Sequence, residues 1–266
     1  MTSRFDQLPS ALRRHGYLER LGSNKAPALL VPAEGGMLSA PMVIWLHGRT
    51  AYKELDPGRY LRLIRSGISV CAVDLPGHGE RIVPEMQESP QVLDVVLQMA
   101  DELDEITSDA TERLRADPDR IGLGGMSAGG MATLTRLCSP HHYAACSVEA
   151  TTGNWTAETT MPMLQATEAT RIAQADPIRH LANWREIPFQ AFHTRADEWV
   201  PYQAQKSFIT ALQAHYHDPD DIEFVTFDQT GALHEHAGFG RYSAEVKEQQ
   251  RRFFCQHLLD TDKDKS

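Results

Sequence analysis

A serine lies at the centre of a glycine-rich stretch, Gly125-Met126-Ser127-Ala128-Gly129. The stretch follows the apolar run RIGLG and precedes MATLTRL, a sequence that favours a helix start. A serine in a tight strand-to-helix turn exposes its hydroxyl, and the following helix directs its amides toward developing negative charge. The pattern therefore predicts that Ser127 is a nucleophile.

A nucleophilic serine needs a histidine base and an acid that orients the base. Where a nucleophilic serine lies in such a strand-to-helix turn, the acid and then the histidine follow later strands of the same sheet. Asp197 comes three residues after the apolar run 188–194, and His234 and His236 lie in the loop after the run 222–228. Serine, acid and histidine thus occur in the required order.

Glycine-rich turns also bind phosphates, and two such sites were considered. A phosphate-binding loop requires G-x-x-x-x-G-K-[ST]. Gly124 and Gly129 have this spacing, but Gly130 replaces the lysine. A dinucleotide site requires G-x-G-x-x-G, which Gly122 and Gly124 begin, but Ser127 replaces the third glycine. The sequence therefore disfavours both phosphate sites.

Short apolar runs bounded by glycine, proline or polar residues predict the strands that position these residues. The runs are 27–32, 41–48, 68–77, 120–125, 143–150, 188–194 and 222–228. Amphipathic helical patterns between and after them cover 56–66, 89–116, 201–215 and 243–259. This alternation predicts an α/β fold with a doubly wound, mostly parallel sheet. Ligands bind such sheets beyond the carboxyl ends of the strands.

One segment interrupts the alternation. Residues 151–186 separate two strands by more than a simple crossover needs, and they are polar with a few large apolar side chains. We expect a small helical cap near the functional edge of the sheet. A plain pair of surface helices is the alternative.

The composition excludes several classes of protein. The 266 residues carry a net charge of −10, which gives no positive surface for nucleic acid or an anionic membrane. No apolar run reaches the length of a membrane span, and the first residues show no secretory signal. The four cysteines are far apart, so we expect buried, reduced thiols in a cytoplasmic protein.

Histidine pairs occur at 141–142, at 215 and 217, and at 234 and 236. No cysteine or carboxylate cluster joins them at the spacing of metal ligands. We therefore expect neither a metal nor a cofactor.

The chain resembles the α/β-hydrolase superfamily over nearly its whole length, in particular the small prolyl-oligopeptidase-like and dienelactone-hydrolase-like serine esterases. The resemblance is carried by WLHG (45–48), DLPGHGER (74–81), GMSAGG (125–130), RADEWVP (195–201) and GALHEH (231–236). It implies a single α/β-hydrolase domain over residues 1–266 with the cap inserted in it.

The resemblance also selects among the candidate acids and bases. In the family the catalytic histidine ends a G-x-x-H stretch, which implies His234 rather than His236. The turn after the preceding strand implies Asp197 rather than Glu198 or Asp228.

Two backbone N–H groups form the oxyanion hole in this family. The resemblance implies Ala128, directly after the serine, and Arg49, with Thr50 as second choice, in the loop after the HG pair (47–48). Arginine is unusual at that position. Its side chain is expected either to reach an acidic group of the substrate or to pair with Glu149.

Other polar residues have supporting roles in this interpretation. His47, His78 and Asp74 are expected to brace loops beside the site. The candidates for the substrate pocket are Arg81, Trp155, Trp184 and Trp199.

These expectations combine into a carboxylesterase that cleaves small esters through an acyl-enzyme on Ser127. A small-molecule ester is then the partner. A peptidase or thioesterase of the same fold is the first alternative, and a non-catalytic ligand-binding module is the second. The sequence does not identify the substrate or the oligomeric state.

Overall fold

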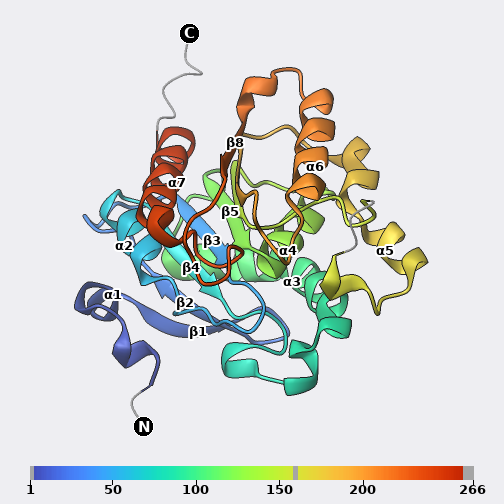
Figure 1. Ribbon diagram of the computed structural model, residues 1–266. Coiled ribbons are helices and arrows are strands. Elements are labelled where there is room, and N and C mark those ends of the chain that lie inside the picture. Colours follow the sequence, from blue (N-terminus) through green and yellow to red (C-terminus); the bar gives the residue numbers. More distant parts are fainter. Residues whose placement is uncertain (1–2, 158–160, 260–266) are drawn as a thin grey trace.

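The computed structural model of the chain describes residues 3–157 and 161–259 (Figure 1). Eight strands form one sheet in the order β1-β2-β4-β3-β5-β6-β7-β8. Their bounds are β1 Tyr17–Leu21, β2 Ala26–Val31, β3 Met42–Leu46, β4 Ser69–Val73, β5 Ile121–Met126, β6 Ala145–Glu149, β7 Phe189–Thr194 and β8 Ile222–Phe227. The strands from β4 to β8 in this order are parallel, which confirms the α/β architecture.

The apolar runs in the sequence do not include β1, which pairs with β2 in an antiparallel hairpin. β1 exposes alternate side chains, whereas every residue of β2 and β3 is buried. A strand that is buried on one face only does not read as a continuous apolar run. For that reason the pattern revealed the other seven strands and not this one.

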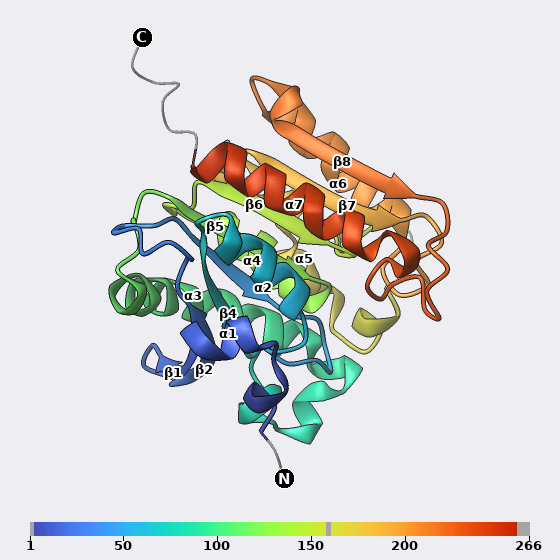
Figure 2. The same ribbon diagram turned by 90° about the vertical axis from the view of Figure 1, so that its left-hand side faces the viewer.

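Helices cover both faces of the sheet, as Figure 2 shows from the side of α2 and α7. The α-helices are α1 Ser10–His15, α2 Pro57–Arg65, α3 Val92–Leu114, α4 Ala128–Leu137, α5 Ala169–Ala175, α6 Tyr202–His215 and α7 Ser243–Leu258. The 3₁₀ helices are η1 Phe5–Gln7, η2 Gly79–Arg81, η3 Pro84–Gln87, η4 Ser89–Gln91, η5 Pro162–Leu164, η6 Pro177–Asn183, η7 Pro219–Asp221 and η8 Gly240–Tyr242.

The alternation of side chains in β3 explains the two layers of helices. Ile44 and Leu46 pack in the core beneath α3, α4 and α6. Val43 and Trp45 point the other way, into the core beneath α1, α2 and α7. Because successive side chains of a strand face opposite sides, a fully buried strand requires helices on both faces.

Residues 151–186 contain η5, α5 and η6, which are all short. Residues 158–160 of this segment lie outside the described part of the chain. The cap therefore stays a prediction for this segment.

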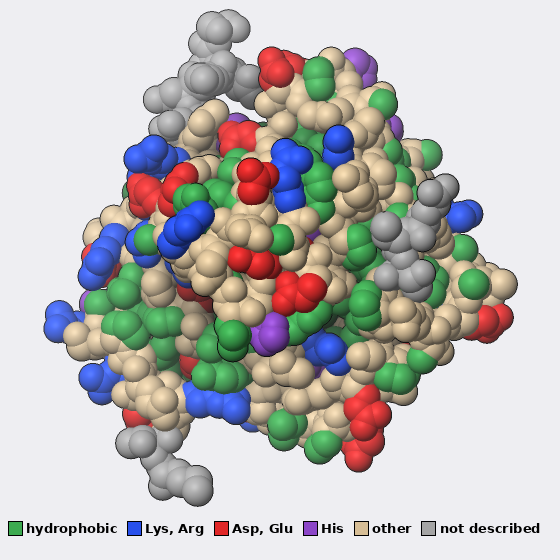
Figure 3. All heavy atoms as spheres, viewed as in Figure 1, with side chains coloured by type: hydrophobic (Ala, Val, Ile, Leu, Met, Phe, Trp, Pro, Cys, Tyr) green, Lys and Arg blue, Asp and Glu red, His purple; other side chains and the backbone are tan. Residues whose placement is uncertain are grey.

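Charged side chains of both signs are interspersed over the face of the molecule drawn in Figure 3. In residues 3–157 and 161–259, no helix is long and apolar enough to cross a membrane.

Close packing between α7 and β5 generates a prediction about stability. A Cβ added at Gly122 would lie 2.7 Å from Cε1 of Phe254, which is shorter than a normal contact. We expect Gly122→Ala to lower the free energy of unfolding by about 1–3 kcal/mol, because overpacking a core forces side chains or backbone to shift. Urea unfolding followed by circular dichroism measures this change.

Gly58→Ala is the matched control, because the nearest atom to its added Cβ is the flexible Nη1 of Arg62 at 3.6 Å. This variant should leave stability within about 0.5 kcal/mol of the wild type. In a Phe254→Leu background, Gly122→Ala should cost less than in the wild type. An equal cost in both backgrounds would rule out the Phe254 contact as the cause.

Candidate active site

Ser127 lies between β5 and α4 with an unusual backbone conformation, φ 52° and ψ −120°. A residue other than glycine in such a conformation is strained, and surrounding contacts must hold it. The Ser127 amide donates to Glu149 O at 2.9 Å, and Ser127 O accepts from the Met131 amide at 2.8 Å and from Thr151 Oγ1 at 3.0 Å. The turn is thus fixed by α4 and by the end of the neighbouring strand β6.

The glycines around Ser127 leave room for this turn. A Cβ at Gly125 would lie 2.5 Å from the carbonyl carbon of Gly129, and one at Gly129 would lie 2.4 Å from Leu46 O. A Cβ at Gly130 would lie 2.7 Å from Thr151 Cβ. The atoms close to Gly125 and Gly129 belong to the backbone, which cannot move aside as a flexible side chain can. The short distance from a Cβ at Gly129 to Leu46 O also shows that α4 starts in direct contact with the end of β3.

Three buried polar side chains meet at the carboxyl ends of β5, β7 and β8. Ser127 Oγ lies 2.9 Å from His236 Nε2, and His236 Nδ1 lies 2.8 Å from Asp197 Oδ2 and 3.0 Å from Oδ1. Asp197 accepts a hydrogen bond from the N–H at Nδ1, so the ring proton stays on Nδ1 and Nε2 is free to accept from the serine hydroxyl. Of the three residues expected to meet, the structure brings together Ser127 and Asp197, and His236 is the histidine between them.

The expectation that His234 occupies this place is wrong. Its ring turns outward and is 53% exposed, and its Nδ1 lies 3.1 Å from Glu198 Oε1. The indole of Trp199 packs against both imidazoles, with centroid distances of 5.2 Å to His234 and 4.9 Å to His236. Trp199 thus contacts both the exposed histidine and the buried one.

Glu235, between the two histidines, explains which of them points inward. Its carboxylate accepts hydrogen bonds from Thr230 N, Thr230 Oγ1 and Gly231 N at 2.7, 2.7 and 2.9 Å. These bonds fold the loop back on itself, so that His234 faces solvent and His236 faces Ser127. In the sequence, this turn corresponds to a glutamate four residues after Gly231.

The carboxylate of Asp197 is held from its other side as well. Oδ1 accepts the amides of Trp199 at 2.9 Å and Val200 at 2.8 Å. His193, which the sequence patterns did not single out, is buried beside it, with Nε2 2.9 Å from Val200 O and 3.5 Å from Asp197 Oδ2. Burial lowers the pKa of His193, which favours the neutral ring.

His47 orients the loop that passes next to Ser127. The Leu75 amide donates to His47 Nε2 at 3.0 Å, so the ring proton is on Nδ1, which donates to Gly48 O at 2.7 Å. A Cβ added at Gly48 would lie 3.4 Å from that of Ser127, in ordinary van der Waals contact, so only a side chain as small as a methyl group would fit between this loop and the serine. In a planar trans peptide the N–H points away from the carbonyl. The Arg49 amide therefore points away from His47, and it has no hydrogen-bond partner among the described residues.

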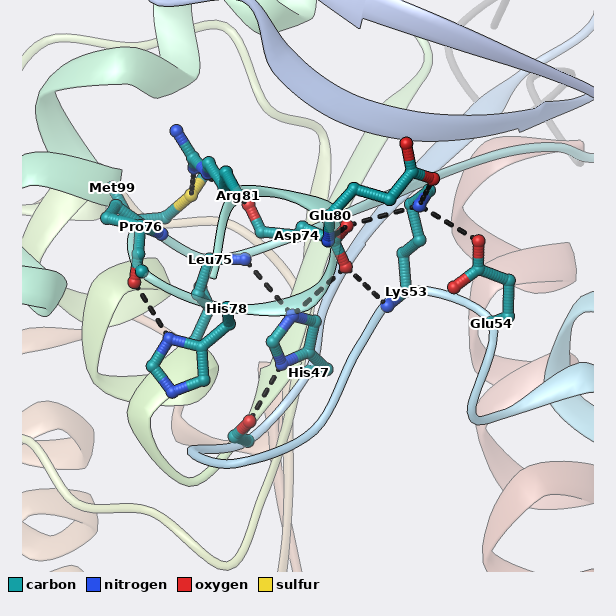
Figure 4. A network of polar contacts seen from close by, with 12 residues as sticks. His47, Lys53, Glu54, Asp74, Leu75, Pro76, His78, Glu80, Arg81 and Met99 are labelled. Atoms are coloured by element: carbon teal, nitrogen blue, oxygen red, sulfur yellow. Dashed lines mark hydrogen bonds and ion pairs between the residues drawn. The ribbon is translucent and has the colours of Figure 1, made fainter. Parts of the chain in front are cut away.

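The same loop rests on a buried lysine, which Figure 4 shows together with its carboxylates. Lys53 Nζ lies 2.8 Å from Glu54 Oε1 and 3.1 Å from Asp74 Oδ2, and it also contacts Glu80. Burial alone would lower the pKa of Lys53, but hydrogen bonds to Glu54 and Glu80, together with the negative charges of Asp74 and Glu54, outweigh burial and raise it. The lysine thus keeps its charge inside the protein.

Asp74 joins this lysine to the loop after β4. Its Oδ1 accepts the Lys53 amide at 2.8 Å, and its Oδ2 accepts the Glu80 amide at 2.9 Å. Burial would raise the pKa of Asp74, but the His47 ring, the Glu80 amide and the charge of Lys53 lower it to about 2. His78 lies beside His47, and its Nδ1 is 2.7 Å from Pro76 O.

A cavity of about 710 Å³ opens beside Ser127 and His236. Its wall is mostly apolar, with contributions from Trp45, Leu55, Met126, Pro162, Met163, Trp199, Phe239 and Val246. Five charged residues also line it: Arg49, Asp56, Arg59, Glu149 and Lys247.

Three of the four pocket candidates do not line this cavity, and Trp199 is the exception. Trp155 is buried, and its indole N–H donates to Thr152 O. Trp184 is also buried and donates to Tyr216 Oη. The Arg81 guanidinium donates to Asp74 O and pairs with Glu102 on α3.

The expected pair between Arg49 and Glu149 is wrong as well, because Arg59 takes that carboxylate. Arg59 Nη2 lies 2.8 Å from Glu149 Oε1 and 2.8 Å from Asp56 Oδ2, with its guanidinium over the ring of Trp45. Arg49 Nη1 instead donates to Gln87 O at 2.9 Å and to Ser89 Oγ at 3.2 Å.

Among residues 3–157 and 161–259, no group of three or more His, Cys, Asp or Glu side chains is arranged to hold a metal ion. The four cysteines are free thiols. Burial raises the pKa of Cys138 to about 12, so this thiol stays protonated.

The fold and a match to the prolyl oligopeptidase family define the chain as a serine hydrolase on an α/β-hydrolase fold. The model of the prolyl oligopeptidase family matches residues 98–261, which is more than half of the chain. The chain therefore belongs to the prolyl oligopeptidase family. A curated Bacillus subtilis (strain 168) protein named "Putative esterase YitV" is 24% identical over 224 residues, which cover 74% of this chain and 84% of that protein.

Solved structures share the fold. Thermus thermophilus TT1662 superposes with a TM-score of 0.70 and 21% identity, covering 92% of this chain and 99% of that one. A puromycin-hydrolyzing peptidase of Mycobacterium tuberculosis superposes with a TM-score of 0.73 and 19% identity. An acylaminoacyl peptidase of Pyrococcus horikoshii superposes with a TM-score of 0.72 and 16% identity. Each match covers 94% of this chain, which spans only 40% and 42% of the two peptidases.

The Asp74 network generates a prediction about acid stability. The pKa of about 2 in the folded protein is below the ordinary 3.8, so ionised Asp74 stabilises the fold above about pH 4. This contribution, about 2 kcal/mol, should disappear as the pH falls from about 4 to 2. Urea unfolding at pH values from 7 to 2.5 measures it.

Asp74→Asn is the comparison variant, since it keeps the shape of the side chain and removes its charge. It should be less stable than the wild type at pH 7 and should show a shallower loss of stability toward acid pH. Equal slopes for the two proteins below pH 4 would contradict the role given to Asp74.

Proposed function

We propose that the protein is a carboxylesterase in which Ser127 is the nucleophile, His236 the base and Asp197 the residue that orients the base. One observation carries the proposal: the serine hydroxyl, the imidazole and the carboxylate form a continuous hydrogen-bonded chain at 2.9 and 2.8 Å beside the cavity. This is the geometry that activates a serine hydroxyl.

In the proposed reaction, Ser127 Oγ attacks the ester carbonyl carbon while His236 Nε2 accepts the hydroxyl proton. Asp197 stabilises the imidazolium that forms. His236 then gives the proton to the departing alcohol, which leaves an acyl group on Ser127. A water molecule, deprotonated by the same imidazole, hydrolyses the acyl-enzyme.

The oxyanion of each tetrahedral intermediate is proposed to bind the amides of Ala128 and Arg49. Ala128 is the first residue of α4, so its N–H has no partner within the helix. The hydrogen bond from His47 to Gly48 O supports the second donor, because it fixes the peptide that carries the Arg49 N–H. Each such donor stabilises the transition state by about 3–4 kcal/mol.

Small esters are the proposed substrates, and a small helical cap over residues 151–186 is proposed to cover them. Support for the cap comes from Pro162 and Met163 of η5, which line the mostly apolar cavity. Support for an esterase comes from the name of the Bacillus relative. Peptidase and thioesterase activities are the alternatives, since peptidases share the fold.

The two histidines provide a direct test of the proposed triad. With 4-nitrophenyl acetate, Ser127→Ala and His236→Ala should each lower kcat/KM by about 10⁴-fold or more, because each removes a member of the unit. His234→Ala should change it less than about tenfold. Initial rates, with the burst of nitrophenolate, measure these effects.

A large loss in His234→Ala with little loss in His236→Ala would overturn this triad. A fluorophosphonate probe should label the wild type and His234→Ala but not Ser127→Ala. Absence of labelling in the wild type would favour a non-catalytic module.

The reaction class needs a separate measurement. We expect 4-nitrophenyl esters of graded chain length to be cleaved with higher kcat/KM than aminoacyl 4-nitroanilides. Faster cleavage of the anilides would identify a peptidase instead.

A further inference from the structure

The cavity beside Ser127 holds an uncompensated positive charge. Three cations and two carboxylates line it. Arg59 pairs with Glu149 and Asp56, and Lys247 Nζ lies 3.5 Å from the other oxygen of Asp56. The remaining cation is Arg49, for which no described carboxylate lies within ion-pair distance.

The guanidinium of Arg49 also has free hydrogen-bonding capacity. Nη1 uses its two N–H groups on Gln87 O and Ser89 Oγ. The N–H on Nε and the two on Nη2 have no hydrogen-bond partner among the described residues. These two contacts tie Nη1 to η3 and η4, and the other three N–H groups are left for a ligand. A guanidinium edge matches a carboxylate, which can accept two parallel hydrogen bonds.

The surroundings strengthen such a contact. Most of the cavity wall is apolar, and a charge pair attracts more strongly there than in water. The protein as a whole carries a net charge of −10, so the positive excess in the cavity is opposite in sign to that of the molecule. The overall charge of the protein would repel anions, so any attraction of an anion to the cavity must come from the local charge of Arg49.

We propose that Arg49 binds a carboxylate of the substrate, so that the preferred substrates are half-esters of dicarboxylic acids or esters of a carboxylate-bearing alcohol. The proposal rests on the esterase function above and specifies its substrate class. Arg49 would then act twice, with its amide on the oxyanion and its side chain on the anionic group. The loop held by His47 and Lys53 (Figure 4) fixes the amide, and the hydrogen bonds to Gln87 and Ser89 fix the guanidinium.

Two isosteric pairs of esters test this inference. The first pair is the 4-nitrophenyl monoester of glutaric acid and 4-nitrophenyl 5-methylhexanoate, in which an isopropyl group replaces the carboxylate of the acyl part. The second is the acetate ester of 4-hydroxybenzoate and that of 4-isopropylphenol, which moves the charge to the leaving group. The ratio of kcat/KM for the anionic and neutral members is compared between proteins, so that differences in intrinsic reactivity cancel.

In Arg49→Gln, the anionic-to-neutral ratio for at least one pair should fall about 10- to 100-fold, the range expected for a hydrogen bond to a charged group. Arg49→Lys keeps the charge and should retain part of the preference. The control Arg252→Gln, an exposed residue of α7, should leave both ratios unchanged. If Arg49→Gln changes both ratios by less than about threefold, the inference is wrong and Arg49 only braces η3 and η4.

Binding without hydrolysis separates this inference from the proposed function. Glutarate should raise the Tm of Ser127→Ala and should do so much less when Arg49→Gln is added. A Tm shift without ester hydrolysis in the wild type would retain the anion site and reject the esterase. Hydrolysis of neutral esters without a Tm shift or anionic preference would retain the esterase and reject the anion site.

Discussion

The strained backbone of Ser127 is the constraint on which the site depends. Its conformation directs the hydroxyl out of the sheet, and only an environment without side chains at 125 and 129 admits it. The start of α4 consequently touches the carbonyls of Leu46 and His47, where β3 ends. The loop with Gly48 and Arg49, which follows β3, therefore passes close to the serine, with room for no more than about a methyl group between Gly48 and Ser127. One local turn thus sets the distance between the two amides proposed as oxyanion donors.

The architecture could be predicted from the sequence because seven strands lie in apolar runs that are long enough to recognise. Parallel strands end at a common edge, and this rule predicted that Ser127 and Asp197 would meet. β1 was missed because Glu19 and other partly exposed residues interrupt its pattern. Local patterns therefore reveal strands that are apolar along their length, and they miss a strand that alternates between core and solvent.

The errors at the site have a common physical cause, which is that loop side chains take their direction from contacts distant in sequence. His234 and His236 differ only in whether they precede or follow Glu235, whose bonds to Thr230 and Gly231 set the turn. Pairing with Glu149 was one of the two roles expected of the Arg49 side chain, but Arg59 of α2 reaches that carboxylate, with its guanidinium over the ring of Trp45. Trp155 and Trp184 are buried because their indole N–H groups find acceptors inside the protein.

The peripheral position of β8 has a consequence for how the protein loses function under mild stress. Among the described residues β8 pairs with β7 alone, most of its residues are partly exposed, and the loop after it carries His236. Ser127 instead follows a strand in the middle of the sheet, with neighbours on both sides. Transient opening of an outer strand takes less free energy than global unfolding. Such opening would withdraw the imidazole of the proposed triad while the serine turn stays folded, so the proposed activity would be lost and regained without global unfolding.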